Sequence, residues 1–306
     1  MIEVKNLSKF YGKNKAVEDL SFEIQKGEIV GFLGPNGAGK TTTMRVLTCF
    51  HPATSGEARV AGFDVFKEAQ KVKEKIGYLP ETPPLYKEMR VRDYLTFVAK
   101  IKGVPFSQVK KNTDEVIEKC GLQTYADSLI LKLSKGYRQR VGIAQALIHK
   151  PEILILDEPT SGLDPAQIIE VRNLIKSLTG EHTILLSTHI LPEVSMTCQK
   201  VVIINRGKIV AKDSLENLSQ SGGLFYSLQI EGEQTDALVS DLHNLKEVSS
   251  VDFMNKNSLK IGLKEDLKTS IKIANLVYKN GLELSELKKE TLSLEEIFVK
   301  LVFGDN

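Results

Sequence analysis

One octapeptide constrains this chain of 306 residues more than any other feature. It reads Gly34-Pro35-Asn36-Gly37-Ala38-Gly39-Lys40-Thr41 and fits the pattern G-x-x-x-x-G-K-[ST] of loops that bind nucleotide phosphates. An apolar strand is predicted just before it, over 28–33, and a helix just after it, over 42–47. Glycines let the backbone turn with its N–H groups pointing inward, and a helix start adds partial positive charge. This order predicts a P-loop; the alternative is a glycine-rich turn without a ligand.

The residue types in this loop indicate what it binds. Lys40 supplies a mobile cation for the β- and γ-phosphates, and Thr41 supplies a hydroxyl ligand for Mg²⁺. The loop as a whole, from Gly34 through Thr42, is predicted to contact the phosphates, mainly through its backbone N–H groups. We therefore expect a nucleoside triphosphate with Mg²⁺.

A second motif supplies acidic groups far along the chain. The apolar run 153–156 predicts a strand buried on both faces, and Asp157 and Glu158 follow at its carboxyl end. Open α/β sheets bind ligands at that end. Asp157 can hold Mg²⁺ directly or through water, and Glu158 is a candidate general base that polarises the attacking water. The alternative is an ordinary solvated strand end.

A third motif, Leu133-Ser134-Lys135-Gly136-Tyr137, lies between the first two. A helical run is predicted from 139 to 149, and Pro151 closes it. Ser134 and Gly136 lie where a helix begins, which predicts another backbone anion site, although a plain N-cap serine explains Ser134 as well. A second phosphate-binding helix start is unexpected for one nucleotide, unless it serves a neighbour's nucleotide.

Together these motifs resemble the ATP-binding subunits of ABC transporters, over about residues 1–218. Residues 133–137 look like the family signature, usually written LSGGQ. The run 161–164 looks like the D-loop, and 187–189 looks like the switch-histidine segment. The resemblance implies ATP and Mg²⁺ as ligands. It also implies that two nucleotide domains pair head to tail around two ATP molecules, as a homodimer or with a second ATPase subunit.

The resemblance further implies roles for single residues. Ser134 and Gly136 would contact the γ-phosphate in the partner's site, and Asp164 would touch the opposing P-loop. His189 would hydrogen-bond the γ-phosphate and position water with Glu158, which makes Lys40, Glu158 and His189 the catalytic set. The alternative for His189 is a packed histidine at a strand end.

An aromatic residue near the N-terminus resembles the one that stacks on adenine in this family. Tyr11 is the candidate, within Lys9-Phe10-Tyr11-Gly12. Stacking on a base contributes about 1–3 kcal/mol. A structural tyrosine is the alternative, and Phe10 is a possible substitute.

The sequence departs from the family pattern at two places. Glu81 stands where the family usually has glutamine; it can still ligate Mg²⁺, and a surface glutamate is the alternative. In the signature, Lys135 replaces a glycine and Tyr137 a glutamine. Such departures resemble the branch that exports drugs, polysaccharides or ions through separate permease subunits. By that resemblance, residues 82–94 are assigned to permease contact; a linker into the helical subdomain is a compatible alternative.

The charge and composition of the chain limit the kinds of partner and the compartment that we expect. The net charge of +2 predicts no nucleic-acid partner, and the three widely spaced cysteines suggest a reducing compartment. No apolar run approaches the ~20 residues that span a bilayer, and the N-terminus reads directly as a strand rather than a signal peptide. We therefore expect a peripheral protein on the cytoplasmic membrane face, with membrane permease subunits as partners.

The predicted fold class is α/β, a P-loop NTPase of the ABC ATPase type with a small second domain. The first domain spans 1–218, with an antiparallel β layer in 1–30, a parallel core from 31–75 and 151–218, and a helical subdomain at about 85–150. A linker at 219–223 leads to an α+β domain over 224–306, whose order β-α-β-β-α-β predicts a ferredoxin-like fold. Regulation, dimer contact, permease docking and passive stabilisation remain open for this domain.

The sequence thus predicts an ATP-hydrolysing subunit that powers transport, with export favoured. One alternative is a soluble ABC ATPase that acts on ribosomes or nucleic acid. Another, suggested by the Glu81 and Lys135 departures, is a regulatory ATP-binding module with weak hydrolysis.

Overall fold

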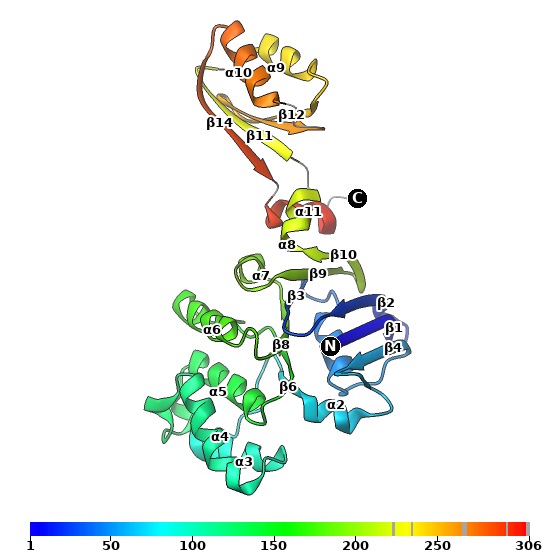
Figure 1. Cartoon of the computed structure of the whole chain (residues 1–306), viewed down its shortest axis with the longest axis vertical. Helices are drawn as coiled ribbons and strands as arrows, with labels where there is room; N and C mark the ends of the chain where they lie inside the picture. Colours follow the sequence, from blue (N-terminus) through cyan, green and yellow to red (C-terminus); the bar gives the residue numbers. More distant parts are fainter. Residues whose placement is uncertain (222–223, 234, 265–267, 292, 304–306) are drawn as a thin grey trace. The chain divides into compact units, whose positions relative to one another are not determined.

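The strongest apolar runs of the sequence become the strands of a six-stranded sheet. The computed structural model describes residues 1–221, 224–233, 235–264, 268–291 and 293–303. The chain separates into two units, Met1–Asp213 and Ser214–Asn306, which Figure 1 colours from blue through green and from yellow-green to red. Of the predicted linker, residues 219–221 belong to helix α8 (Leu215–Ser221), and 222–223 lie outside the described residues. The division into domains at 218 stays a prediction.

The sheet of the first unit has the order β10-β9-β3-β8-β7-β6. Its strands are β3 (Ile29–Leu33), β6 (Ile76–Leu79), β7 (Ile153–Asp157), β8 (Thr183–Thr188), β9 (Lys200–Asn205) and β10 (Lys208–Ser214). The neighbours from β9 to β6 run parallel. Strands β3, β7 and β8 are buried at every position, as expected for parallel strands covered on both faces. The predicted parallel core is confirmed.

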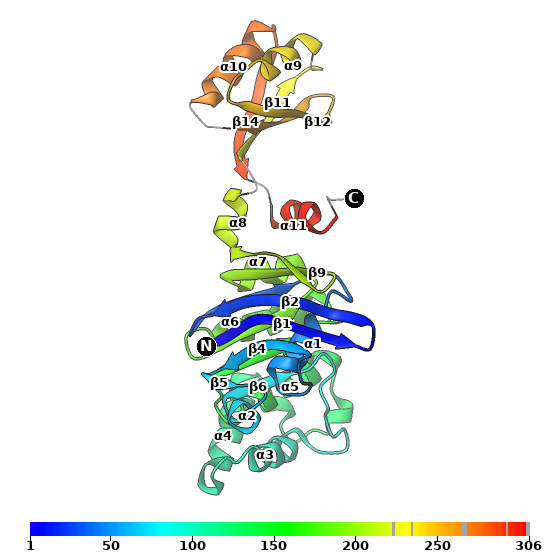
Figure 2. The same ribbon diagram turned by 90° about the vertical axis from the view of Figure 1, so that its right-hand side faces the viewer.

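An antiparallel layer packs beside this core, as Figure 2 shows for β1, β2 and β4. Its order is β2-β1-β4-β5, with β1 (Ile2–Tyr11), β2 (Asn14–Ile24), β4 (Ser55–Val60) and β5 (Phe63–Asp64). The prediction limited this layer to residues 1–30, whereas β4 comes from the segment assigned to the core. Ala58 and Val60 of β4 are fully buried in the same apolar cluster as Ile2 and Val4 of β1, so long-range packing places this strand.

The helices of the first unit fall into two groups. Helices α1 (Lys40–Leu47), α6 (Pro165–Ser177) and α7 (Leu191–Thr197) follow core strands, and α2 (Ala69–Lys75) directly precedes the core strand β6. Helices α3 (Val91–Ile101), α4 (Phe106–Lys119) and α5 (Lys135–Leu147), with two 3₁₀ turns at Gln123–Tyr125 and Ile130–Lys132, gather as a separate layer (Figure 1). The helical subdomain predicted at about 85–150 contains these elements.

Helix α4 begins at Phe106, directly after Pro105. The predicted start of the next helix was wrong. Helix α5 begins at Lys135 rather than at 139, because the Ser134 hydroxyl caps it by accepting from the Tyr137 N–H at 3.3 Å.

The second unit contains the predicted β-α-β-β-α-β order. Its elements are β11 (Leu224–Glu231), α9 (Asp236–His243), β12 (Val248–Asn255), β13 (Ser258–Leu263), α10 (Thr269–Lys279) and β14 (Glu283–Thr291), followed by α11 (Leu294–Phe303). The sheet order β12-β13-β11-β14, antiparallel throughout, is that of a ferredoxin-like fold. The predicted start of α10 at Leu267 lies outside the described residues. Ser293 and Glu296 form a reciprocal capping box before α11, as the Ser293 cap prediction requires.

Candidate functional site

The carboxyl ends of three adjacent strands bring the predicted motifs together. The P-loop follows β3, the acidic pair ends β7, and the switch-histidine segment ends β8, which lies between the other two. The register pairs Leu33 with Thr188, and Asp157 with Ser187. Parallel strands therefore align motifs that are more than a hundred residues apart, as open α/β sheets do at their ligand sites.

Backbone geometry explains the glycines of the P-loop. Gly37 and Gly39 have φ values of 77° and 106°, which side chains rarely adopt. A Cβ atom on Gly39 would lie 2.7 Å from the Ala16 carbonyl oxygen. Gly39 directly precedes α1, so the loop folds back onto the start of that helix. A substitution at Gly39 would therefore distort both the loop and its contact with β2.

Lys40 is held at the centre of the loop. Its side chain is 5% exposed, and its ammonium donates to the carbonyl oxygens of Gly34 at 2.8 Å and Pro35 at 3.2 Å. The same ammonium lies 3.2 Å from Oε1 of Glu158. A buried cation needs such partners because desolvation is costly. The P-loop and the end of β7 are thus joined by one ion pair.

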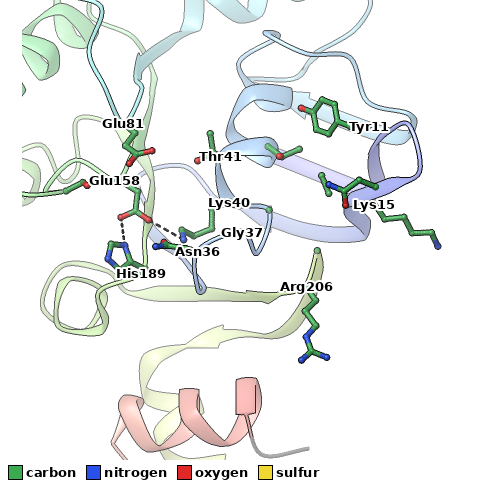
Figure 3. A pocket seen from close by; sticks show the side chains of 16 residues that line it. Tyr11, Lys15, Asn36, Gly37, Lys40, Thr41, Glu81, Glu158, His189 and Arg206 are labelled. Atoms are coloured by element: carbon green, nitrogen blue, oxygen red, sulfur yellow. Dashed lines mark hydrogen bonds and ion pairs between the residues drawn. The ribbon is translucent and has the colours of Figure 1, made fainter. Parts of the chain in front are cut away.

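Glu158 connects this ion pair to the switch histidine. Figure 3 shows its carboxylate between Lys40 and His189, whose Nδ1 lies 2.8 Å from Oε2 of Glu158. The backbone of Glu158 is left-handed, with φ 49°, and its N–H donates to the Ser187 carbonyl oxygen at 3.1 Å. A non-glycine residue in this region is uncommon and is often found at functional sites. Here the turn directs the side chain toward the P-loop.

Asp157 lies fully buried beside the loop. Its Oδ1 accepts from the Ser187 hydroxyl at 2.5 Å and from the Thr41 hydroxyl at 3.3 Å. Its Oδ2 is buried without a hydrogen-bond partner. Burial raises the pKa of Asp157, and the nearby charges of Glu158 and Glu81 raise it further. The hydrogen bonds from the Ser187 and Thr41 hydroxyls act in the opposite direction, but the pKa remains raised. An unpartnered buried carboxylate oxygen needs an explanation such as an ion.

A cavity of about 700 Å³ opens over these groups. The predicted residues that line it are Tyr11, Asn36, Gly37, Gly39, Lys40, Thr41, Thr42, Glu81, Glu158 and His189. Phe10 is not among its lining residues. A neighbouring cavity of about 480 Å³ is lined by Asp157 and shares Thr41 and Glu81 with the first.

Some lining residues were not predicted. They are Asn14, Lys15 and Ala16 of β2, Ser161 of the loop after β7, and Arg206 and Gly207 of the β9–β10 turn. The Arg206-Gly207 turn was visible as a hairpin signal, but nothing local indicated that it faces the nucleotide loop. Gly207 donates its N–H to the Ala38 carbonyl oxygen at 3.0 Å, which brings the turn there. Figure 3 shows the Lys15 and Arg206 side chains pointing away from Lys40.

The three residues that the resemblance assigns to a partner's site do not line this cavity. Ser134 caps α5, Asp164 caps α6 by accepting from the Gln167 N–H at 2.9 Å, and Gly136 is buried, with the Gln167 side chain beside it. Their predicted roles belong to a partner's site and stay predictions. The remaining loop residues support the loop from within: Ala38 is 2% exposed, and the Gly34 N–H donates to the Thr188 carbonyl oxygen at 3.4 Å.

Among the described residues, none of the helices has both the length and the apolar character needed to cross a bilayer. A P-loop at the end of β3, acids at the end of β7 and a histidine at the end of β8 define the class of P-loop nucleoside triphosphatases. Within this class, the antiparallel layer and the helical subdomain are the features predicted for the ABC ATPase type.

Comparisons with known proteins identify the family. The profile of the ABC transporter family matches residues 17–161. The bacitracin transport ATP-binding protein BcrA of Bacillus licheniformis is 37% identical over 99% of this chain and 98% of its own. The linearmycin resistance ATP-binding protein LnrL of Bacillus subtilis is 34% identical over 98% of both chains. This chain belongs to the family of ABC transporter ATP-binding proteins.

Solved structures agree with this assignment. The ATP-binding subunit of an ABC transporter superposes with a TM-score of 0.66 at 30% identity, over 72% of this chain and 92% of that one. The dimeric cassette MJ0796 gives a TM-score of 0.64 at 26% identity, over 70% of this chain and 99% of that one. The resemblance, the fold class and the prediction of an ATP-hydrolysing transport subunit are confirmed.

Proposed function

We propose that this chain powers export through a separate membrane permease, acting as one of two paired cassettes at the cytoplasmic membrane face. Two relatives that match almost the whole chain are named for bacitracin transport and linearmycin resistance. The signature departures at Lys135 and Tyr137 resemble the same exporting branch. Support from relatives over 98–99% of the chain favours this function over the ribosome-acting and regulatory alternatives.

The observation that carries the proposal is the position of Glu158. Its carboxylate lies between the Lys40 ammonium at 3.2 Å and the His189 Nδ1 at 2.8 Å, and it is 6% exposed. A carboxylate only accepts, so Nδ1 of His189 carries the proton of this hydrogen bond. His189 thereby orients Glu158, and its other ring nitrogen can donate to the γ-phosphate when that nitrogen also carries a proton.

The proposed hydrolysis follows from these contacts. When the phosphates of ATP enter the loop, Lys40 exchanges its contact with Glu158 for their oxygens, because the triphosphate brings several anionic acceptors for charge-assisted bonds to the ammonium. Oε1 of Glu158 is then free to accept a proton from the water that attacks the γ-phosphorus. The bond between that phosphorus and the bridging oxygen breaks, and ADP leaves with the electron pair. Glu158 and His189 thus hold the water in line.

The residues beside the loop fit Mg²⁺. Asp157 offers a buried, unpartnered Oδ2, and its Oδ1 accepts from Thr41 at 3.3 Å. Carboxylate and hydroxyl oxygens are the ligands that Mg²⁺ takes in proteins. Among the described residues no group of three His, Cys, Asp or Glu side chains could hold a metal. We infer that Thr41, Asp157 and Glu81 contribute single ligands, and that the bound ion neutralises phosphate charge.

Pairing of two cassettes gives Ser134, Gly136 and Asp164 a role. Ser134 and Gly136 lie at the start of α5, where backbone N–H groups and partial positive charge favour an anion. They do not line the cavity of their own chain, so a γ-phosphate at this helix start belongs to a partner's nucleotide. The structural neighbour MJ0796 is described as a dimeric cassette.

The permease contact is proposed along residues 82–94. Tyr86 in this segment is 54% exposed, and Phe97 just after it is 37% exposed. Thr82 and Pro84 also line the 480 Å³ cavity that Thr41, Glu81 and Asp157 border. A membrane partner seated there would lie next to the metal side of the nucleotide site, which offers a direct route from hydrolysis to transport.

The test is the Glu158→Gln variant, which keeps the shape of the side chain and removes the base. We expect steady-state ATP hydrolysis to fall by about 100-fold or more, the usual contribution of a general base. Nucleotide affinity should stay within about threefold, since the amide oxygen still faces the loop. A trapped ATP-dependent dimer should appear in size-exclusion chromatography.

The matched control is Glu57→Gln, a change of the same type at an exposed position of β4. It should hydrolyse ATP at the wild-type rate. Normal turnover by Glu158→Gln would remove Glu158 from the role of base, and with it the proposed chemistry.

A further inference from the structure

A third buried carboxyl group, beside those of Asp157 and Glu158, lies on α7. Glu193 is 3% exposed, and both of its oxygens accept hydrogen bonds from threonine hydroxyls. Oε1 accepts from Thr160, and Oε2 accepts from Thr188 at 2.7 Å. Thr160 and Thr188 are themselves 3% and 0% exposed. The P-loop, Mg²⁺ and base assignments leave all three side chains without a role.

Each of the two threonines lies within two residues of a reacting group: Thr160 in the loop after β7, and Thr188 at the end of β8. Thr160 lies two residues after Glu158, in the loop that leads to Asp164. Thr188 directly precedes His189, and its hydroxyl also accepts from the Ile190 N–H at 3.0 Å. Glu193 therefore joins the loop after β7 to the end of β8, and it is not among the residues that line the nucleotide cavity.

The loop after β7 is folded so that fixing Thr160 also fixes Glu158. The Ser161 N–H donates to the Glu158 carbonyl oxygen at 3.1 Å, and the Leu163 N–H donates to the Thr160 carbonyl oxygen at 3.1 Å. These consecutive turns leave the segment few ways to move independently. Because Glu158 also holds an uncommon left-handed backbone, a support just beyond it is needed to maintain that conformation.

Stability alone is a poor reason for this arrangement. The partners of Glu193 are neutral hydroxyls rather than Lys or Arg, so a strongly polar side chain is buried without an opposite charge in these hydrogen bonds. Apolar residues of similar volume generally stabilise a core as well or better than buried ionic groups. Two hydrogen bonds from one rigid carboxylate do, however, set the distance between two loops.

We propose that Glu193 is a positioning residue for ATP hydrolysis, which fastens Thr160 to Thr188 and so keeps Glu158 and His189 in one geometry. The inference rests on the proposed function, since it assigns Glu193 no contact with ATP. Its consequence is specific. Loosening the link lowers kcat, because the water and the base lose their alignment. It leaves nucleotide binding unchanged, because the P-loop is held by its own contacts.

The experiment compares Thr160→Val, Thr160→Ser and Glu193→Gln in the full chain. Valine keeps the shape of threonine and removes the hydroxyl, whereas serine keeps the hydroxyl. We expect kcat to fall by about 10-fold in Thr160→Val and Glu193→Gln, with KM for ATP within about twofold. Thr160→Ser should retain at least half of the wild-type kcat. The double variant Thr160→Val/Glu193→Gln should be no slower than the slower single variant, because both break one link.

A matched control separates positioning from packing. Thr113 of α4 is 1% exposed, and its hydroxyl has no hydrogen-bond partner. Thr113→Val therefore tests the same chemical change away from the site, and it should keep wild-type kcat. All rates are expressed per folded molecule, counted by binding of a fluorescent ATP analogue, so partial unfolding cannot imitate a loss of kcat.

Each outcome of this experiment either supports or contradicts the positioning role of Glu193. Wild-type kcat in Thr160→Val and Glu193→Gln, additive losses in the double variant, or an equal loss in Thr160→Ser would overturn the positioning role. The proposed function is judged separately, by hydrolysis in the wild type and its loss in Glu158→Gln. If the wild type hydrolyses ATP and Thr160→Val keeps the wild-type kcat, the inference about Glu193 is rejected, whereas the proposed function is not.

Discussion

The two units of the chain bury different kinds of side chain. Both have a four-stranded antiparallel sheet and a continuous apolar cluster. In the first unit, however, ionisable groups are also less than a tenth exposed: Lys40, Asp157, Glu158, His182 and Glu193. In the described part of the second unit, the buried polar side chains are those of Ser258 and Thr269, which carry no charge.

This difference indicates where the chemistry takes place. Burying a charged group costs free energy unless partners compensate it, so a buried charge without a functional role adds little to the stability of the fold. These ionisable groups lie at or next to the carboxyl ends of β3, β7 and β8. The exception is His182, at the opposite end of β8, whose charged form is disfavoured because burial lowers its pKa. The second unit has the burial pattern of a scaffold or docking module. The predictions below test this contrast, in order of their expected effect on ATP turnover.

The largest effect is expected from Lys40→Ala. The Lys40–Glu158 pair is more than nine-tenths buried on both sides, and truncating one member leaves the other charge unpaired. We expect nucleotide affinity to fall by about 3 kcal/mol or more, roughly 100-fold, measured by titration with a fluorescent ATP analogue. Lys13→Ala, at an exposed position near the same cavity, is the control and should bind normally. Unchanged binding by Lys40→Ala would contradict the phosphate-loop assignment.

A smaller loss of turnover is expected from Asp157→Asn, on the order of 10–100-fold at fixed Mg²⁺.

Without nucleotide, the same variant should be more stable than the wild type at neutral pH. Burial raises the pKa of Asp157 in the folded chain. Between the ordinary pKa and the raised one, the unfolded chain therefore binds fewer protons than the folded chain.

The sign of the pH dependence follows from this difference in bound protons. Wild-type stability decreases as pH rises through that window, and stays reduced above it. Asparagine cannot titrate, so the advantage of Asp157→Asn should vanish at pH values below the ordinary carboxyl pKa. Thermal unfolding across pH, without Mg²⁺, checks this. An advantage that is the same at every pH would show that burial of the charge is not its cause.

Tyr11→Ala should weaken ATP binding by about 10-fold, within the 1–3 kcal/mol range of base stacking. Tyr11 ends β1 at the rim of the cavity, is 42% exposed, and has the Lys9 ammonium 5.0 Å from its ring centroid. Tyr11→Phe keeps the ring and should bind like the wild type. Equal binding by Tyr11→Ala would favour the structural-tyrosine interpretation, and affinities for adenosine and inorganic triphosphate would show which half of ATP is affected.

The site illustrates what local sequence can predict. Lys40, Asp157 and Glu158 were predicted because each follows an apolar run, and parallel strands bring their carboxyl ends to one edge. His189 was predicted through the family resemblance. The P-loop glycines were predicted for the same local reason, a backbone that only glycine adopts readily. The ferredoxin-like order was visible from alternating apolar positions and cap residues in 224–306.

What the sequence could not show depends on contacts between distant segments. The turn at Arg206 is held at the cavity by backbone hydrogen bonds of Gly207 to Ala38 and to Glu18, which are distant in sequence. Strand β4 joins the antiparallel layer through its pairing with β1. The link from Glu193 to Thr160 joins residues 33 positions apart. No periodicity or motif encodes these distances, because the side chains meet only after the sheets have packed.

The smallest effect on turnover is expected from Ile261→Ala in the second unit. Ile261 is fully buried at the centre of β13, and its truncation should destabilise that unit by about 2–5 kcal/mol. Limited proteolysis should show faster cleavage within 224–306, while ATP turnover stays at the wild-type rate. The matched variant is Ile155→Ala, equally buried in β7 two residues before Asp157. It should lower turnover, because the strand that carries Asp157 and Glu158 shifts. If Ile261→Ala reduced kcat as much as Ile155→Ala, the second unit would act on the hydrolysis step, and the contrast drawn from burial would not hold.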